Sequence, residues 1–316
     1  MTAEPRPWSR RALRALAVVG ALALAGGITV EHLGAAAIVY APNAGHPPSP
    51  AKDPPVVAEA GLETRALHVE VGPPSASLSL WLLGPAAPRA PRATVFVLHG
   101  IRDQKRSMVG WGERLAAMGY RAVLVDSRGH GRSSGDHLTY GVLEARDLSQ
   151  ALDALTAQGL APGRVGVMGV SYGAATAIEW AAVEPRVAAV VAVAPFQSLR
   201  AVVPVYVERF LPGVGGLIPD LLIGRAIARA GRTGGFDPDQ SPLEAITRTR
   251  APVLLVHGRE DVNIPPSHSE ALHARALDHS ELLLVEGEDH QSITADRSGI
   301  LWRRAGAWLQ KALDPG

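Results

Sequence analysis

The fold is decided by one segment, Arg164-Val165-Gly166-Val167-Met168-Gly169-Val170-Ser171-Tyr172-Gly173. Its apolar first part predicts a buried strand, and the small residues that follow predict a helix. A serine inside Gly-x-Ser-x-Gly between a strand and a helix is typical of a sharp turn that holds the hydroxyl free for attack. Because such a turn tolerates no bulk two residues to either side, we interpret Ser171 as a nucleophile and Gly169 and Gly173 as the residues that make room for it.

A serine hydroxyl needs a base, and a histidine oriented by a carboxylate can act as one. For this type of turn the order along the chain is serine, acid, histidine. Asp261 lies in the loop after a predicted strand that ends near His257, and it is preferred over its neighbour Glu260. His290 follows the last predicted strand and is the predicted base. Three other histidines are predicted to lie on a solvated surface: His268, His273 and His279.

Acyl transfer also needs two backbone N–H groups to bind the developing oxyanion. One is expected from Tyr172, the residue after the nucleophile. The second is expected from Ile101, in the loop after the predicted strand Thr94–Leu98, where Gly100 lets the backbone turn. His99 is interpreted as organising this loop by a hydrogen bond, in preference to serving as a base.

Strands and helices alternate along the body of the chain, and this rhythm predicts a mostly parallel sheet with helices on both faces. A Gly-Pro-Pro turn between the first two strands predicts an antiparallel hairpin. A stretch of about fifty residues after Pro195 is rich in apolar side chains but lacks a convincing strand. It predicts a helical cap inserted at about 198–245. The eight predicted strands are Ala66–Val71, Leu78–Leu83, Thr94–Leu98, Ala122–Val125, Val165–Val170, Ala188–Val193, Val253–Val256 and Leu282–Val285.

Composition excludes several other classes of protein. The chain has 316 residues, a formal net charge of +1 and no cysteine, so disulfides, thiol nucleophiles and zinc–thiolate sites are excluded and no strong field for nucleic acid exists. The glycine-rich stretch 129–135 places its third glycine one residue late for a dinucleotide loop. No spacing typical of a metal site is found, so we expect neither a cofactor nor a metal.

The N-terminus reads as a targeting or anchoring segment over residues 1–41. Four arginines precede an apolar run from Ala15 to Val30, an order that predicts the N-terminus inside and the remaining chain outside the cytoplasm. We prefer an uncleaved membrane anchor in the cell envelope; the alternative is a signal peptide cleaved near Ala23-Leu24-Ala25, giving an exported soluble protein. Residues 42–60 are rich in proline and predict an extended linker before the domain at 61–316. The oligomeric state is not predicted.

Taken together, these motifs resemble the α/β-hydrolase superfamily. The resemblance rests on His99-Gly100, on the segment Asp126–Ser133, on the serine turn, on the segment His257–Pro265 and on the late His290, and it covers residues 60 to 314. Within the superfamily the chain looks most like the membrane-anchored and serine aminopeptidase S33-like groups. The resemblance implies an α/β-hydrolase fold of eight strands with a small helical cap. It implies a Ser171, Asp261 and His290 triad, with Ile101 and Tyr172 as the oxyanion hole.

These observations predict a serine hydrolase that cleaves ester or thioester bonds through an acyl-enzyme, most like a carboxylesterase or lipase. The apolar insertion favours a small-molecule or lipid-like acyl substrate. Two alternatives keep the same triad: an aminopeptidase or amidase, and an acyltransferase whose acceptor is not water. A catalytically silent binding protein is the alternative from another class.

Overall fold

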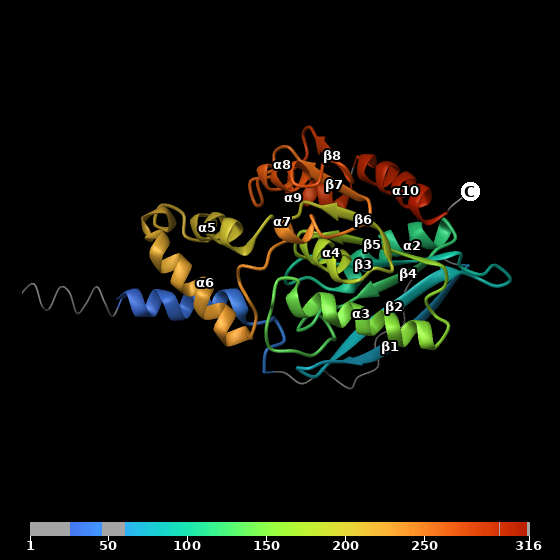
Figure 1. The fold of residues 1–316 in the computed structure, drawn as a ribbon, viewed down its shortest axis with the longest axis horizontal. Helices are drawn as coiled ribbons and strands as arrows, with labels where there is room; N and C mark the ends of the chain where they lie inside the picture. Colours follow the sequence, from blue (N-terminus) through green and yellow to red (C-terminus); the bar gives the residue numbers. More distant parts are fainter. Residues whose placement is uncertain (1–25, 46–60, 297, 315–316) are drawn as a thin grey trace, which may run out of the picture.

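An eight-stranded sheet runs through the computed structural model, which describes residues 26–45, 61–296 and 298–314. The strand order is β1-β2-β4-β3-β5-β6-β7-β8 (Figure 1). The first two strands form the predicted antiparallel hairpin, β2 pairs antiparallel with β4, and all other neighbours are parallel. The predicted mostly parallel sheet is therefore confirmed. The strands are β1 (Leu62–Val71), β2 (Ala76–Pro85), β3 (Ala93–Leu98), β4 (Arg121–Val125), β5 (Arg164–Val170), β6 (Val187–Val193), β7 (Val253–Gly258) and β8 (Ser280–Val285).

Helices cover both faces of the sheet, which is why its central strands are apolar throughout. One face packs against α3 (Val142–Ala157), α4 (Tyr172–Val183) and α8 (Ser267–Ala274). The other face packs against α2 (Val109–Ala117) and α10 (Ile300–Leu313), whose inward side chains include Leu115 and Leu309. Two short elements complete the layers, η1 (Lys105–Met108) and α9 (His290–Ala295). The parallel strands therefore deliver the loops that follow them to one common edge.

The cap lies between β6 and β7. It contains α5 (Leu199–Phe210), η2 (Gly215–Leu217) and α6 (Asp220–Gly234), with the short α7 (Pro242–Ala245) leading back to the sheet. Figure 1 shows α5 and α6 projecting from the side of the sheet domain. The cap has its own small core, in which Leu199 and Val203 of α5 pack with Ile223 and Ile227 of α6.

The segment before the linker completes this cap. Residues 26–39 are helical and lie beside α6 (blue in Figure 1), with Ala35, Ile38 and Val39 buried in the cap core. Glu31 forms an ion pair with Arg225 at 2.9 Å. The following turn is tied to the sheet domain, because the Ala41 N–H donates to the carbonyl of Asp136. Residues 26–41, assigned from sequence to the anchoring segment, are thus packed against the hydrolase fold.

Residues 1–25 of the predicted anchoring segment (1–41) and residues 46–60 of the predicted linker (42–60) lie outside the described residues. Among the residues that the structure describes, none of the helices combines the length and the apolar character needed to cross a bilayer.

Candidate active site

The serine turn has the strained geometry that its glycines predict. Ser171 follows β5 with φ of 53° and ψ of −114°, a backbone conformation that is unfavourable for any residue with a side chain. A Cβ atom on Gly169 would lie 2.2 Å from the carbonyl oxygen of Gly173, and one on Gly173 would lie 2.5 Å from that of Leu98. Both positions therefore admit only glycine. The turn places the serine at the carboxyl edge of the sheet, with its backbone N–H donating to the Val193 carbonyl at 2.8 Å.

The predicted acid and base meet directly. The Nδ1 atom of His290 lies 2.6 Å from Oδ2 of Asp261, although 29 positions separate the two residues in the chain. Because an ionised carboxylate can only accept hydrogen bonds, Nδ1 carries the proton and Nε2 is left as a basic lone pair. His290 is the first residue of α9, and Asp289 before it caps that helix by accepting hydrogen bonds from the N–H groups of Gln291 and Ser292. The preferred Asp261 thus forms this contact, and Glu260 does not.

Asp261 is held as a carboxylate by every donor around it. Its Oδ1 accepts the backbone N–H groups of Asn263 at 2.8 Å and Ile264 at 2.9 Å. Burial acts to raise the pKa of Asp261, but hydrogen bonds from His257, His290 and the Ile264 amide outweigh it and hold the pKa well below its usual value. The acid therefore remains charged throughout the neutral range.

Sequence reasoning missed a supporting residue, His257, at the end of β7. Its Nε2 donates to the Ile264 carbonyl at 2.8 Å and lies 3.3 Å from Oδ2 of Asp261. On the other side of the ring, Ser269 bonds to Nδ1 at 2.7 Å. The side chain is fully buried, so it fixes the loop that carries the acid. Its position at the end of a predicted strand, four residues before Asp261, was the sequence feature that could have indicated a contact with the acid.

The acid loop packs against the helix that follows the nucleophile. Ile264 shares a buried apolar cluster with Ala175 of α4, one turn after Ser171. Ser171, Asp261 and His290 follow the parallel strands β5, β7 and β8, so all three lie at the same edge of the sheet. No hydrogen bond joins Ser171 and His290 among the described residues. In substrate-free enzymes such catalytic contacts are commonly long and tighten when substrate binds.

The predicted oxyanion loop lies against the serine. A Cβ atom on Gly100 would be 3.7 Å from Cβ of Ser171, so this backbone approaches the nucleophile closely. Among the hydrogen bonds of the described chain, none has the N–H of Ile101 or Tyr172 as donor. Both groups are therefore available to an incoming oxygen.

His99 organises the oxyanion loop, as its sequence position predicts. Its Nε2 accepts the Ser127 N–H at 3.0 Å, and its Nδ1 lies 2.7 Å from the Gly100 carbonyl. Burial lowers the pKa of His99, which keeps the ring neutral and suited to this pair of bonds.

An apolar pocket of about 490 Å³ opens onto Ser171, a volume typical of small-ligand sites. The sheet domain contributes Ile101, Arg102, Tyr140, Tyr172 and Phe196, and the cap contributes both α5 and α6. Arg102 is the one charged side chain among the lining residues that the structure describes. The nucleophile itself is only 6% exposed, so a substrate reaches it through this pocket.

The N-terminal helical segment forms one wall of the pocket. Val30, Leu33, Gly34, Ala37 and Ile38 line it at the spacing of a single helix face. The wall is fixed in place because the Tyr140 hydroxyl, itself at the pocket, donates to the Ile38 carbonyl at 2.7 Å. Hydropathy alone could not separate this role from a membrane anchor, since an acyl pocket and a bilayer favour the same side chains.

One expectation about the histidines is wrong. His268 was expected on the surface, but its side chain is buried and its Nδ1 accepts the Gln197 N–H at 3.2 Å. Burial lowers the pKa of His268 to about 4. The ring is therefore a neutral acceptor that connects α8 to the loop before α5. Periodicity within one short helix could not reveal that this loop covers the side chain.

The fold is that of an α/β hydrolase, and comparisons with known proteins agree. Residues 89–241 match the model of the serine aminopeptidase S33 family, and residues 237–316 match that of the prolyl oligopeptidase family. These matches and the fold support the α/β-hydrolase superfamily, and they support a serine hydrolase in general terms.

Individual relatives cover most of the chain. The uncharacterised protein YqkD of Bacillus subtilis is 27% identical over 216 residues, 67% of this chain and 69% of the relative. Rv2307c of Mycobacterium tuberculosis is 27% identical over 286 residues, 89% of this chain and 90% of the relative. Among solved structures, a Pyrococcus furiosus esterase has a TM-score of 0.62 at 22% identity, covering 80% of this chain and 92% of its own. An acylaminoacyl peptidase of Pyrococcus horikoshii has a TM-score of 0.60 at 18% identity, covering 81% and 43%.

Proposed function

We propose that the protein hydrolyses carboxylic esters or thioesters of apolar acyl groups through an acyl-enzyme on Ser171. The observation that carries this proposal is the hydrogen bond between His290 and Asp261 at the sheet edge that also bears the strained serine. Strain at a nucleophilic turn is retained where function requires it, which disfavours the catalytically silent alternative.

In the proposed reaction, Ser171 Oγ attacks the acyl carbonyl carbon while Nε2 of His290 takes the hydroxyl proton. The N–H groups of Ile101 and Tyr172 bind the oxyanion of the tetrahedral intermediate. His290 then donates the proton to the departing alcohol or thiol. Water attacks the acyl-enzyme with His290 again as base, releasing the acid and restoring the serine. Asp261 stays ionised and stabilises the imidazolium that forms in each half-reaction.

The pocket supports an apolar acyl group over a charged one. An aminopeptidase must bind a free α-ammonium beside the scissile bond, for which a carboxylate or several carbonyl groups would be needed. The lining residues described include no carboxylate, and the charged side chain present, Arg102, has the wrong sign. A water-hydrolysing esterase is therefore preferred over an aminopeptidase. An acyltransferase keeps the same first half-reaction and differs only in the acceptor.

The test uses the full-length protein and a fluorophosphonate probe, which reacts with activated serines. We expect labelling of the wild type and none of Ser171→Ala, together with hydrolysis of a series of p-nitrophenyl esters. A folded wild-type protein that neither labels nor turns over any ester or thioester would overturn the proposal. Product analysis in the presence of alcohol or amine acceptors separates hydrolysis from transfer.

A further inference from the structure

Exposed apolar side chains are concentrated on one end of the molecule. Of the eleven large hydrophobic residues that are exposed in the described chain, seven lie on the cap or the N-terminal helical segment. We define the cap tip as residues Phe210–Leu221, between α5 and the start of α6; Asp220 is its one charged residue. Its exposed hydrophobic residues are Phe210, Leu211, Val214, Leu217 and Leu221. A soluble surface seldom gathers so many, and such patches commonly mark a docking surface.

The cap tip is continuous with the substrate pocket. Phe210 is 72% exposed and Leu33 67% exposed, yet both also line the pocket that contains Ser171. Leu211 is also exposed and lines the pocket, and the half-buried Ile218 lines it beside them. Apolar side chains therefore extend from the outside of the cap tip into the pocket that contains the nucleophile.

The direction of the N-terminal chain indicates what covers the cap tip. Gly27 lies against Leu222, the residue directly after the cap tip, at 3.5 Å for a Cβ placed on the glycine. Gly27 of the described helical segment therefore lies beside the cap tip; in the sequence, the apolar run that includes it begins at Ala15 and is preceded by arginines. This order of charged and apolar residues is the pattern of a segment that associates with lipid. If a second copy of the chain or another protein covered the cap tip, its position beside this lipid-type sequence would have no explanation.

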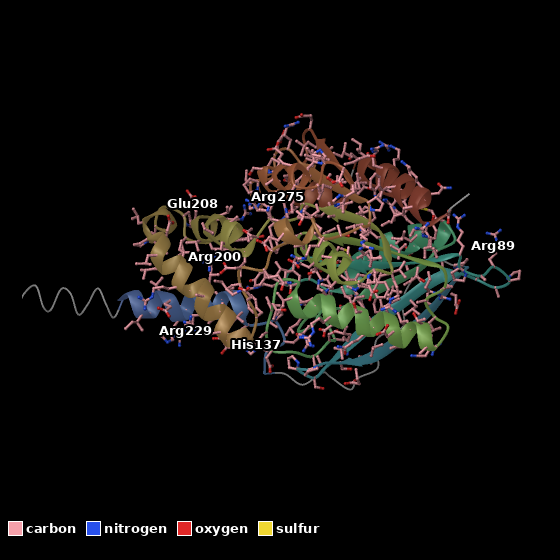
Figure 2. All side chains as sticks on the ribbon, viewed as in Figure 1. Arg89, His137, Arg200, Glu208, Arg229 and Arg275 are labelled. Atoms are coloured by element: carbon pink, nitrogen blue, oxygen red, sulfur yellow. The ribbon has the colours of Figure 1, made fainter. Side chains whose placement is uncertain are left out.

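The charged residues around the cap tip are compatible with a membrane surface. Glu208 and Arg209 precede it, and the α6 face beyond it carries Arg225, Arg229 and Arg232. Figure 2 shows Glu208 and Arg229 at opposite edges of the cap. Glu31 pairs with Arg225 at 2.9 Å and lies within ion-pair distance of Arg229 and Arg232, so one carboxylate faces three arginines and Arg232 remains 66% exposed. Cations beside an apolar surface favour anionic lipid headgroups.

We propose that the cap tip is a lipid-docking surface and that the pocket opens onto the bilayer, so that a membrane-resident acyl chain reaches Ser171 directly. This inference rests on the proposed esterase function and names its substrate class. The proposal has two consequences that can be tested independently. The cap tip should contact lipid, and esters embedded in vesicles should be hydrolysed faster when the cap tip is intact.

The contact is tested on the full-length protein in vesicles of phosphatidylcholine and phosphatidylglycerol. Because the chain has no cysteine, Leu217→Cys gives a single site for an environment-sensitive nitrobenzoxadiazole dye. We expect a blue shift on adding vesicles and quenching by brominated lipid. Leu277→Cys is the matched control, since Leu277 is 69% exposed and lies after α8, outside the cap. Equal spectra at the two sites would overturn the proposal. A blue shift that appears without vesicles when the protein concentration is raised would also overturn it, because it would indicate that a second copy covers the cap tip.

The turnover test compares a water-soluble p-nitrophenyl acetate with a long-chain ester held in vesicles. Leu217 and Leu221 do not line the pocket, so Leu217→Ser/Leu221→Ser should leave acetate hydrolysis unchanged. The same variant should lose about tenfold or more of the vesicle activity, because apolar area that would enter the lipid is removed. Val183→Ser/Leu277→Ser is the control and should retain both activities. Equal losses on both substrates would overturn the proposal. If the wild type hydrolysed neither ester, the proposed esterase function would be contradicted. The dye experiment would still decide whether the cap tip contacts lipid.

Discussion

The Nε2 atom of His257 lies 3.3 Å from the same Asp261 oxygen that accepts the hydrogen bond from His290. Two histidines, one fully buried and one partly exposed, thus converge on a single carboxylate oxygen. The buried one also bonds to the Ile264 carbonyl, and the Ile264 N–H bonds back to Asp261. In the proposed reaction, His257 would therefore act as a positioning residue that fixes the carboxylate orienting the base.

Replacing His257 with alanine should lower kcat with little change in KM. The loss should be about tenfold, since a hydrogen bond to a charged group contributes about 1.5–3 kcal/mol and the backbone amides still hold the other oxygen of Asp261. The measurement is ester kinetics on protein shown to be folded by circular dichroism. A rise in KM at constant kcat would contradict a positioning role and indicate a disturbed pocket.

Replacing His290 with alanine should leave the fold intact and lower kcat by several orders of magnitude, because the removal of one member of a triad disables the whole. The side chain is near the surface of α9 and contributes little to the core. Thermal unfolding provides the control, and it should remain close to that of the wild type. Turnover within about tenfold of the wild type would reassign the base.

Replacing Ala37 with tryptophan should shorten the acyl chains that the enzyme accepts. Ala37 lines the pocket from the N-terminal helical segment, and a large ring there would occupy space beside Ser171. We expect kcat/KM for a dodecanoate ester to fall about tenfold or more while the acetate ester is unaffected, as expected for steric exclusion of the longer chain alone.

The matched control for that substitution is His32→Trp. His32 is exposed on the same helical segment and does not line the pocket, so its replacement should not alter chain-length preference. If both variants changed the preference equally, the effect would come from the helix as a whole, and the wall assigned to Ala37 would be wrong.

Stability should depend on pH through Glu179, a buried residue of α4 whose Oε2 accepts a hydrogen bond from Gln240 at 3.0 Å. Burial raises the pKa of Glu179 from its ordinary value of 4.5 to about 7. Between these values the folded protein holds a proton that the unfolded chain releases, so the free energy of unfolding falls as pH rises. This contribution is fully present below pH 4.5 and is lost as pH passes through about 7.

Glu179→Gln should remove this dependence. Relative to the wild type, the variant should gain up to about 3 kcal/mol in the free energy of unfolding between about pH 5 and pH 8. Urea unfolding at the two pH values measures the difference, and groups that titrate equally in both proteins cancel. A stability difference that is the same at both pH values would contradict the assignment.

The sheet and the acid–base pair follow from sequence because their signals are local. A buried parallel strand is a short apolar run, and the residues that follow such runs share an edge, which brings Asp261 to His290. The hairpin strands extend beyond their predicted ends, to Leu62 and Pro85, because backbone pairing continues past the apolar residues. The sequence could not show which segments pack against each other when they lie far apart in the chain. The burial of His257 and His268 and the packing of residues 26–39 on the cap depend on segments far away in the chain.

The position of the pocket wall constrains how the N-terminus can be processed. The small-residue motif at 23–25 immediately precedes Gly26, the first described residue of the helical segment that contacts the cap. Cutting after Ala25 would release a leader while leaving Val30 to Ile38 in the mature enzyme, and retention of the leader would leave the same wall in place. Either maturation route is thus compatible with an intact acyl site, whereas a proteolytic cut downstream of Ile38 would separate the enzyme from part of its own specificity pocket.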